Sequence, residues 1–116
     1  MNSLDFVKKL RSFVIDFNLN EYKKLLEELK SSDRKEEQWS PTLKFYNNLD
    51  AESQKVFFSI VREIKVDTTS LILGILDGRM ILDNQEEDFF LSLQGSNKPI
   101  NGELQERFLE LEEGAD

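Results

Sequence analysis

The residues that could do chemistry in this chain are carboxylates, because its 116 residues include no histidine and no cysteine. An imidazole general base and a thiolate nucleophile are therefore both excluded. No glycine-rich segment has the spacing of a phosphate-binding loop. The tightest group of acids is Asp83, Glu86, Glu87 and Asp88. These acids are the first candidates for a metal or catalytic site.

The spacing of these acids does not fit a calcium-binding loop. An EF-hand loop needs a glycine at its sixth position and a glutamate at its twelfth. In DNQEEDFFLSLQ, which begins at Asp83, those positions hold Asp88 and Gln94. A glycosidase pair would need two acids facing each other in a cleft, which a domain of this size seldom encloses. We therefore expect that the protein is not an enzyme and that it binds no metal and no cofactor. The alternative of lowest rank is an enzyme that uses carboxylates and a bound metal.

Charge is distributed unevenly along the chain, whose net charge is -8. Residues 1–76 contain 12 basic and 12 acidic side chains, whereas residues 77–116 contain three basic and 11 acidic ones. The C-terminal end should carry a negative field that repels nucleic acid and anionic lipid and attracts a basic protein. Solubility alone is the competing explanation. The candidate partner-binding acids are Asp83, Glu86, Glu87, Asp88, Glu103, Glu106, Glu110, Glu112 and Glu113.

Trp39, the only tryptophan, lies between a charged segment and Ser40-Pro41. An aromatic ring at this place either fixes a loop on the core or anchors a partner. Packing on the core is the simpler interpretation, and we keep Trp39 as a candidate partner contact.

Composition bounds the class of protein. The apolar fraction of 39% includes nine phenylalanines, which suffice for a core, and the 33% of charged residues solvate the exterior. The N-terminus lacks the apolar run of a signal peptide, and the uncharged stretch between Asp67 and Asp77 is less than half of the ~20 residues that span a bilayer. The lack of cysteine suits a reducing compartment. We expect one domain over residues 1–116 in a bacterial cytoplasm, with no membrane partner.

Apolar periodicity predicts two N-terminal helices, over residues 4–17 and 19–30. Ser3 would cap the first helix and Asn18 the second, so that the two form a helical hairpin. The expected inward residues are Phe6, Val7, Leu10, Phe13, Val14 and Phe17, followed by Tyr22, Leu25, Leu26 and Leu29.

Two further helices are predicted over residues 41–48 and 51–77, the first burying Leu43 and Tyr46. Asp50 suits the N-cap of the longer helix, and Gly78 suits its left-handed C-cap. Whether this helix bends near Asp67 is left open.

The most apolar stretch, SLILGILDGRMIL from Ser70, ends that helix. We expect Leu71, Ile72, Ile75 and Leu76 to face the core rather than to form an exposed binding face, because large apolar patches on monomers are uncommon. Gly74 would let a neighbouring element approach closely.

Beyond Gly78 the pattern is that of strands. Two apolar runs flank a polar turn and predict a β-hairpin over residues 79–93. Asn101 would then cap a last helix over residues 102–112. The predicted fold is thus α+β and mostly α: about four helices, a hairpin and a C-terminal helix in a single compact domain.

The segment TTSLILGILDG at residues 68–78 is followed by Phe89-Phe90-Leu91 and by INGELQERF at residues 100–108. This order resembles a group of small uncharacterised bacterial proteins in which a helix ending in Leu-Asp-Gly leads into a hairpin and a closing helix with a Leu-x-x-x-Phe pattern. The resemblance implies the same architecture and no activity.

Together these patterns favour a non-catalytic interaction module that binds a basic protein through its acidic C-terminal end. An immunity or inhibitor protein is the most specific form of this hypothesis. The alternative is a self-associating structural or accessory subunit, whose contact would be the hairpin edge or the phenylalanine-rich first helix.

Overall fold

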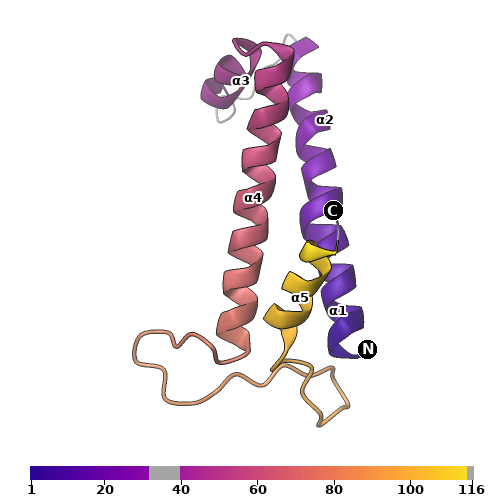
Figure 1. Ribbon diagram of the computed structural model, residues 1–116, viewed down its shortest axis with the longest axis vertical. Helices are drawn as coiled ribbons and strands as arrows, with labels where there is room; N and C mark the ends of the chain where they lie inside the picture. Colours follow the sequence, from indigo (N-terminus) through magenta and orange to yellow (C-terminus); the bar gives the residue numbers. More distant parts are fainter. Residues whose placement is uncertain (32–39, 115–116) are drawn as a thin grey trace.

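Helices form most of the described chain. The computed structural model describes residues 1–31 and 40–114. One long rod runs alongside α4, α3 crosses one end of this pair, and α5 lies between α4 and α1 at the other end (Figure 1). The rod consists of three consecutive segments. The elements are α1 (Ser3–Arg11), η1 (Ser12–Phe17) and α2 (Asn18–Ser31), which make the rod, then α3 (Ser40–Asn47), α4 (Ala51–Leu76) and α5 (Leu104–Glu113).

The N-terminal rod is continuous, so the predicted helical hairpin capped by Asn18 is wrong. Asn18 has helical backbone angles, φ -66° and ψ -37°, and its side chain accepts a hydrogen bond from Lys65 of α4. The N-cap of α1 is Asn2 rather than Ser3, since the Asn2 side-chain oxygen accepts from the Asp5 N–H at 2.8 Å.

The π-helix η1 changes which residues of the rod face the core. A π-turn contains one more residue than an α-turn, so the buried face advances by one position. Val7 and Ile15 are fully buried, whereas Phe13 and Phe17 are exposed and stack with their ring centroids 5.4 Å apart. The expectation that these two phenylalanines face the core is therefore wrong.

The described core consists of two clusters. One joins α2, α3 and α4 around Leu26, Leu43 and Phe58. The other joins α1, η1, α4 and α5 and includes Leu73 and Phe108. The clusters lie one after the other along the molecule, whose Cα radius of gyration of 18.0 Å exceeds the roughly 13 Å of a compact domain of this length.

The helix α4 is continuous through Asp67. At its start the Asp50 carboxylate accepts from the Ser53 N–H at 2.8 Å, and this hydrogen bond lowers the pKa of Asp50. At its end the Arg79 N–H donates to the Gly74 carbonyl at 2.9 Å, while Gly78 has φ +80°. This is the left-handed C-cap that the sequence predicts, in the form of a Schellman motif.

Gly74 allows two side chains to pack against α4. A Cβ at this position would overlap the side chains of Met80 and Gln105. Gln105 uses this space to donate from its Nε2 to the Ser70 carbonyl at 3.0 Å, which ties α5 to α4. The expected close approach at Gly74 is therefore present.

The predicted β-hairpin over residues 79–93 is wrong, and the α+β fold class with it. No strand occurs within residues 1–31 or 40–114, and residues 77–103 form an irregular loop. A hairpin of two strands is marginal in water unless a third strand or a helix packs on it. In the loop, backbone groups form hydrogen bonds with side chains instead of with a second strand. For example, the Leu91 N–H donates to Asn101 Oδ1 at 2.9 Å. The hairpin implied by the family resemblance is likewise not present in this loop.

Two polar residues hold this loop to the helices. Asn101, predicted as the cap of the last helix, instead donates from its Nδ2 to the Leu76 carbonyl. Asp77 takes the capping role, because its two carboxylate oxygens accept from the N–H groups of Gly102 and Gln105 at 2.6 and 2.8 Å. The residue that ends α4 thus satisfies one free N–H in the first turn of α5, that of Gln105, together with the N–H of Gly102 just before the helix.

Candidate interaction surface

Five of the predicted site residues lie on the loop over residues 77–103. Glu103 directly precedes α5, and we refer to the other four as the loop acids: Asp83, Glu86, Glu87 and Asp88. Within the loop, the Gln85 side chain accepts from the Leu82 N–H and donates to the Glu87 carbonyl. All the loop acids are exposed, and no basic side chain in the described part of the chain forms an ion pair with them. Their negative charge is therefore uncompensated locally.

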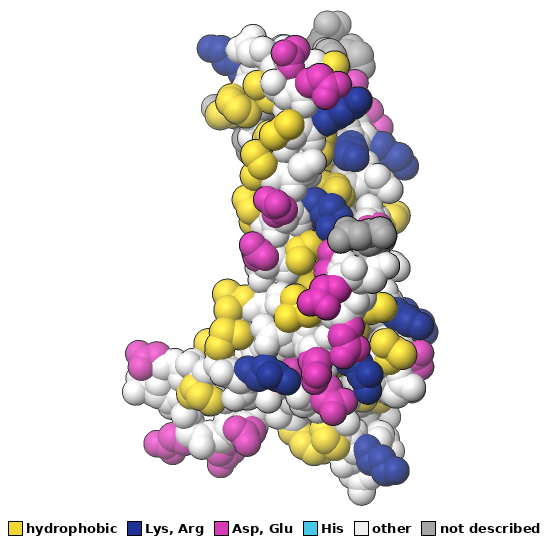
Figure 2. Space-filling view, viewed as in Figure 1, with side chains coloured by type: hydrophobic (Ala, Val, Ile, Leu, Met, Phe, Trp, Pro, Cys, Tyr) yellow, Lys and Arg dark blue, Asp and Glu magenta, His cyan; other side chains and the backbone are white. Residues whose placement is uncertain are grey.

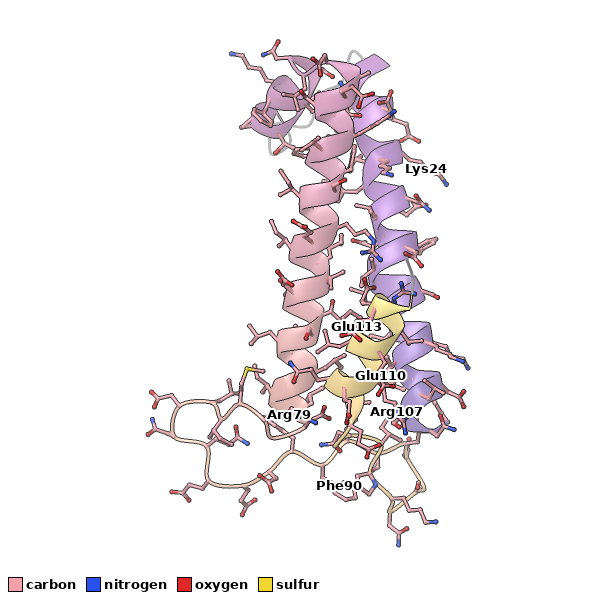
Figure 3. The ribbon with its side chains drawn as sticks, in the orientation of Figure 1. Lys24, Arg79, Phe90, Arg107, Glu110 and Glu113 are labelled. Atoms are coloured by element: carbon pink, nitrogen blue, oxygen red, sulfur yellow. The ribbon has the colours of Figure 1, made fainter. Side chains whose placement is uncertain are left out.

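The acids of α5 lie in a different environment. Arg107 is 3.5 Å from Glu103 and 3.9 Å from Glu110, and Arg79 is 3.8 Å from Glu106. Figure 3 shows Arg79, Arg107 and Glu110 gathered around α5. These exposed pairs contribute little stability, but they offset the charge of the helix. The structure thus separates the uncompensated loop acids from Glu103, Glu106 and Glu110, whose charge is offset. Glu113, at the end of α5, is exposed and forms no ion pair with the described residues.

Glu112 does not belong to the acidic surface, contrary to the prediction. Its carboxylate accepts from Arg11 Nε at 2.6 Å and from Arg62 Nη1 and Nη2 at 3.1 and 3.2 Å. Burial raises the pKa of Glu112, but the hydrogen bonds from the two guanidinium groups outweigh it and leave this pKa lowered. The sequence held a signal for this position, because Glu112 follows Leu104 and Phe108 at four-residue steps on the buried side of α5.

Large apolar side chains are exposed among the loop acids. They are Ile81, Leu82, Phe89, Phe90 and Leu93, between 42% and 62% exposed. Loops of this length are uncommon in small domains and are usually either functional or disordered. Aromatic residues beside polar ones are typical of protein-binding surfaces. Sequence reasoning missed these residues because it assigned them to strands. Trp39, the remaining predicted contact, lies outside the described residues.

A second apolar surface runs along α4, and the prediction that Leu71 and Ile72 face the core is wrong. Both side chains are half exposed, whereas Thr69 and Leu73 are buried. The helices of the bundle pack on one side of α4, and no hairpin covers the other side. Figure 2 shows the hydrophobic side chains in a column along α4, with acidic side chains beside them. We refer to this column as the α4 stripe: Val56, Ile60, Ile64, Leu71 and Ile72.

An aromatic cluster lies where α3 meets α4. Tyr46 packs edge-on to Phe58 with ring centroids 5.5 Å apart, and its hydroxyl is 3.2 Å from Glu27. Burial, followed by this hydrogen bond, raises the pKa of Tyr46. Lys23 Nζ lies 5.3 Å from the centroid of the Phe58 ring, a cation–π contact. All of these contacts support the fold, and none leaves a reactive group exposed to a substrate.

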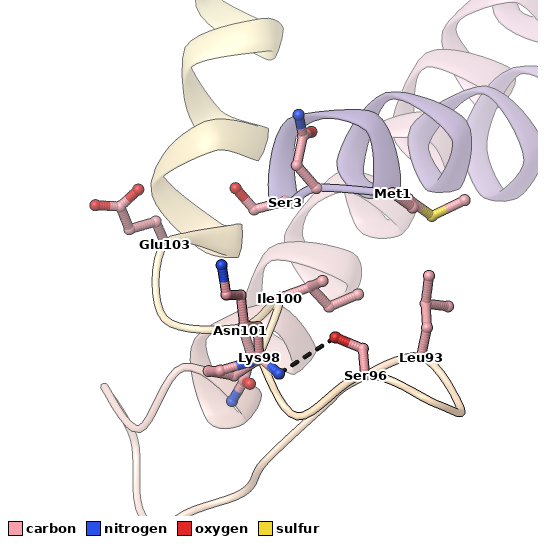
Figure 4. Close-up of a pocket in the computed structure, with 10 residues that line it drawn as sticks. Met1, Ser3, Leu93, Ser96, Lys98, Ile100, Asn101 and Glu103 are labelled. Carbon is pink, nitrogen blue, oxygen red and sulfur yellow. Dashed lines mark hydrogen bonds between the residues drawn. The ribbon is translucent and has the colours of Figure 1, made fainter.

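An open pocket of about 510 Å³ lies between the N-terminus of α1 and the loop (Figure 4). Among the described residues that line it, Lys98 and Glu103 have charged side chains, and the Lys98 N–H donates to Ser96 Oγ at 3.3 Å. No nucleophile and base face each other in this pocket. No group of three or more acids within residues 1–31 and 40–114 is arranged to hold a metal ion.

No protein-family model matches the chain, and no curated protein or solved structure is significantly similar to it. No helix in the described ranges is both long enough and apolar enough to cross a membrane.

Proposed function

We propose that this chain is a non-catalytic interaction module of the bacterial cytoplasm that binds a basic protein through its acidic C-terminal end. The observation that carries the proposal is that the loop acids are exposed and uncompensated, and that the exposed Phe89 and Phe90 follow them directly on the same loop. Unpaired carboxylates attract lysine and arginine over a screening length of about 10 Å, and the aromatic rings supply short-range contact area. A protein that inhibits or neutralises a basic partner is the most specific form of this function.

The loop contributes more to this attraction than α5 does. Arg79 and Arg107 already offset the field of Glu103, Glu106 and Glu110. A basic partner would have to displace these contacts to use these three acids, whereas the loop acids are available without rearrangement.

The proposal is tested by charge reversal on the loop with a matched control. Glu86→Lys/Glu87→Lys changes the net charge by as much as Asp16→Lys/Glu21→Lys, whose sites lie on η1 and α2. Each tagged protein is used as bait in a lysate of the source organism at low and at moderate salt. We expect the wild type and the control to retain a basic protein at low salt and to release it as salt rises. Equal capture by all three proteins, or no capture at either salt, would contradict the proposal.

Self-association is a second candidate function, favoured by the exposed phenylalanines of η1. Phe13 and Phe17 stack beside Lys8 and Lys9, so their surface is apolar and basic and complements an acidic surface on another copy. Sedimentation equilibrium tests this candidate. A mass that rises with concentration and returns to that of the monomer in Phe13→Ser/Phe17→Ser would support it, and a concentration-independent monomer would remove it.

A further inference from the structure

The α4 stripe is a second surface, apart from the loop acids. Its residues Val56, Ile60 and Ile64 are spaced by four; after the exposed polar residues Asp67 and Thr68, Leu71 continues the same side of the helix and Ile72 lies next to it. At ~1.5 Å per residue the stripe is about 24 Å long. Each of its five side chains leaves on the order of 100 Å² accessible, so the stripe exposes roughly 500 Å², comparable to the largest apolar patch on a typical monomer.

In the middle of α4, the basic side chains point toward the other helices and the acidic side chains lie on the exposed side with the stripe. Arg62 turns toward Glu112, and Lys65 turns toward Asn18, so both of these bases point into the bundle. Glu63 and Asp67, in contrast, are exposed, and no basic side chain in the described ranges pairs with either. On a helical projection Glu63 falls at one edge of the stripe, and Asp67 falls within it, between Ile64 and Leu71. The stripe is thus an apolar surface with one acid at its edge and one between its apolar side chains.

We propose that the α4 stripe binds an amphipathic helix of the partner protein, with an apolar face bordered by lysine and arginine. This inference rests on the proposed function, because it names the kind of segment that a basic partner presents. Apolar residues of the helix cover the stripe, and its basic residues meet Glu63 and Asp67. A helix of about 16 to 18 residues matches the length of the stripe.

A second copy of this chain fits the stripe less well. A two-fold axis through the middle of the stripe would pass near Ile64 and bring the Glu63 carboxylates of both copies together, which like-charge repulsion disfavours. In addition, a stable interface usually buries about 800 Å² on each partner. The stripe alone offers less than this, whereas a single docked helix needs less.

The test uses two synthetic peptides of about 18 residues. Both have the same leucine-rich face, which is bordered by lysine in the basic peptide and by glutamate in the acidic one. Their binding to the full chain is measured by fluorescence anisotropy, and binding of the basic peptide is repeated with four variants. The variants are Ile60→Ser/Ile64→Ser in the stripe, Glu63→Lys/Asp67→Lys at its two acids, Glu86→Lys/Glu87→Lys in the loop, and Phe13→Ser/Phe17→Ser as an apolar control on η1.

We expect the basic peptide to bind at least roughly tenfold more tightly than the acidic one, and the stripe variant and the Glu63→Lys/Asp67→Lys variant each to weaken it by roughly tenfold. The η1 control should bind within about twofold of the wild type. Thermal unfolding followed by circular dichroism verifies that every variant is folded. Because the substituted side chains are exposed, we expect little change in their melting temperatures.

Three results would overturn the inference. The first is equal binding of the two peptides, the second is unchanged binding by the stripe variant, and the third is concentration-dependent self-association that the stripe variant abolishes. The loop variant separates this inference from the proposed function. Weak binding by the loop variant with full binding by the stripe variant would leave the proposed function standing without the α4 stripe. Full binding by both variants would remove both.

Discussion

Glu112 accepts hydrogen bonds from two arginines that belong to two different helices, α1 and α4. One carboxylate therefore joins three elements near the middle of the molecule. Asp77 acts similarly at the end of the bundle, because it ends α4 and accepts from the N–H of Gln105 in the first turn of α5 and from that of Gly102 just before it. At the scale of single residues, these two acids support the fold, while the loop acids remain available to a partner.

Replacing Glu112 by glutamine removes the charge that faces both guanidinium groups. We expect Glu112→Gln to lower the free energy of unfolding by about 1.5–3 kcal/mol, the range for hydrogen bonds to charged groups. Urea denaturation at neutral pH measures this loss. The exposed neighbour Glu113 supplies the control, and Glu113→Gln should change the free energy by less than about 0.5 kcal/mol. Equal losses in the two variants would contradict the role of the ion triad.

The same carboxylate makes stability depend on pH. The pKa of Glu112 in the folded protein lies below its ordinary value of 4.5, so the unfolded chain binds the proton more readily. Its contribution is fully present above that value and is lost as pH falls through the folded pKa. Denaturation curves between neutral and acidic pH should therefore show a shallower decline in Glu112→Gln than in the wild type. A parallel decline would exclude this source of acid sensitivity.

Asp77→Ala leaves the N–H groups of Gly102, just before α5, and Gln105, in its first turn, without their carboxylate. We expect a loss of about 1–2 kcal/mol in the free energy of unfolding, as for other helix caps. Faster amide hydrogen exchange should appear at Gly102 and Gln105. Asp83→Ala, which removes an exposed acid from the same loop, should leave both quantities near their wild-type values.

At the scale of elements, α4 has two different apolar sides. Leu73 is 1% exposed and Ile72 is 52% exposed. We expect Leu73→Ala to cost about 2–5 kcal/mol in the free energy of unfolding and Ile72→Ala less than about 1 kcal/mol. Chemical denaturation of the two single variants measures the contrast. Similar losses in both would mean that the outer side of α4 is covered in solution.

Elements whose signals are local could be predicted from the sequence. The cap at Asp50 and the left-handed residue Gly78 were found because each depends on a few neighbouring positions. The buried positions Leu104 and Phe108 followed from periodicity. The hairpin could not be judged in this way, because a strand depends on partners that the local sequence does not place.

Features that depend on packing between elements were not predictable. The exposure of Phe13 and Phe17 follows from a π-turn, for which their sequence carries no distinctive signal. The acids of the C-terminal end were identified correctly as exposed with the exception of Glu112, whose arginine partners lie far away in the sequence. Which side of α4 is covered likewise depends on where α5 and the rod lie.

At the scale of the whole molecule, two clusters in a row make an elongated particle. Its principal extents are 52 × 33 × 27 Å. We expect small-angle scattering from the monomer to give a radius of gyration close to the 18.0 Å of the Cα atoms. A value near the ~13 Å of a compact domain would contradict the arrangement. A value that grows with concentration would indicate the self-association considered above.

The π-helix η1 also bears on how the length of the chain can change. A π-turn contains one residue more than an α-turn, and the helical segments on both sides of it still direct the same residues at their neighbours. It therefore has the structure expected when a single residue is inserted into an α-helix. Deleting one residue within Ser12–Phe17 would restore an α-helix with Val7 and Leu19 still directed at the same neighbours. A deletion in the middle of α4 would instead rotate half of that helix by about 100°. The rod thus contains a point at which the gene can lose one codon without turning the core outward.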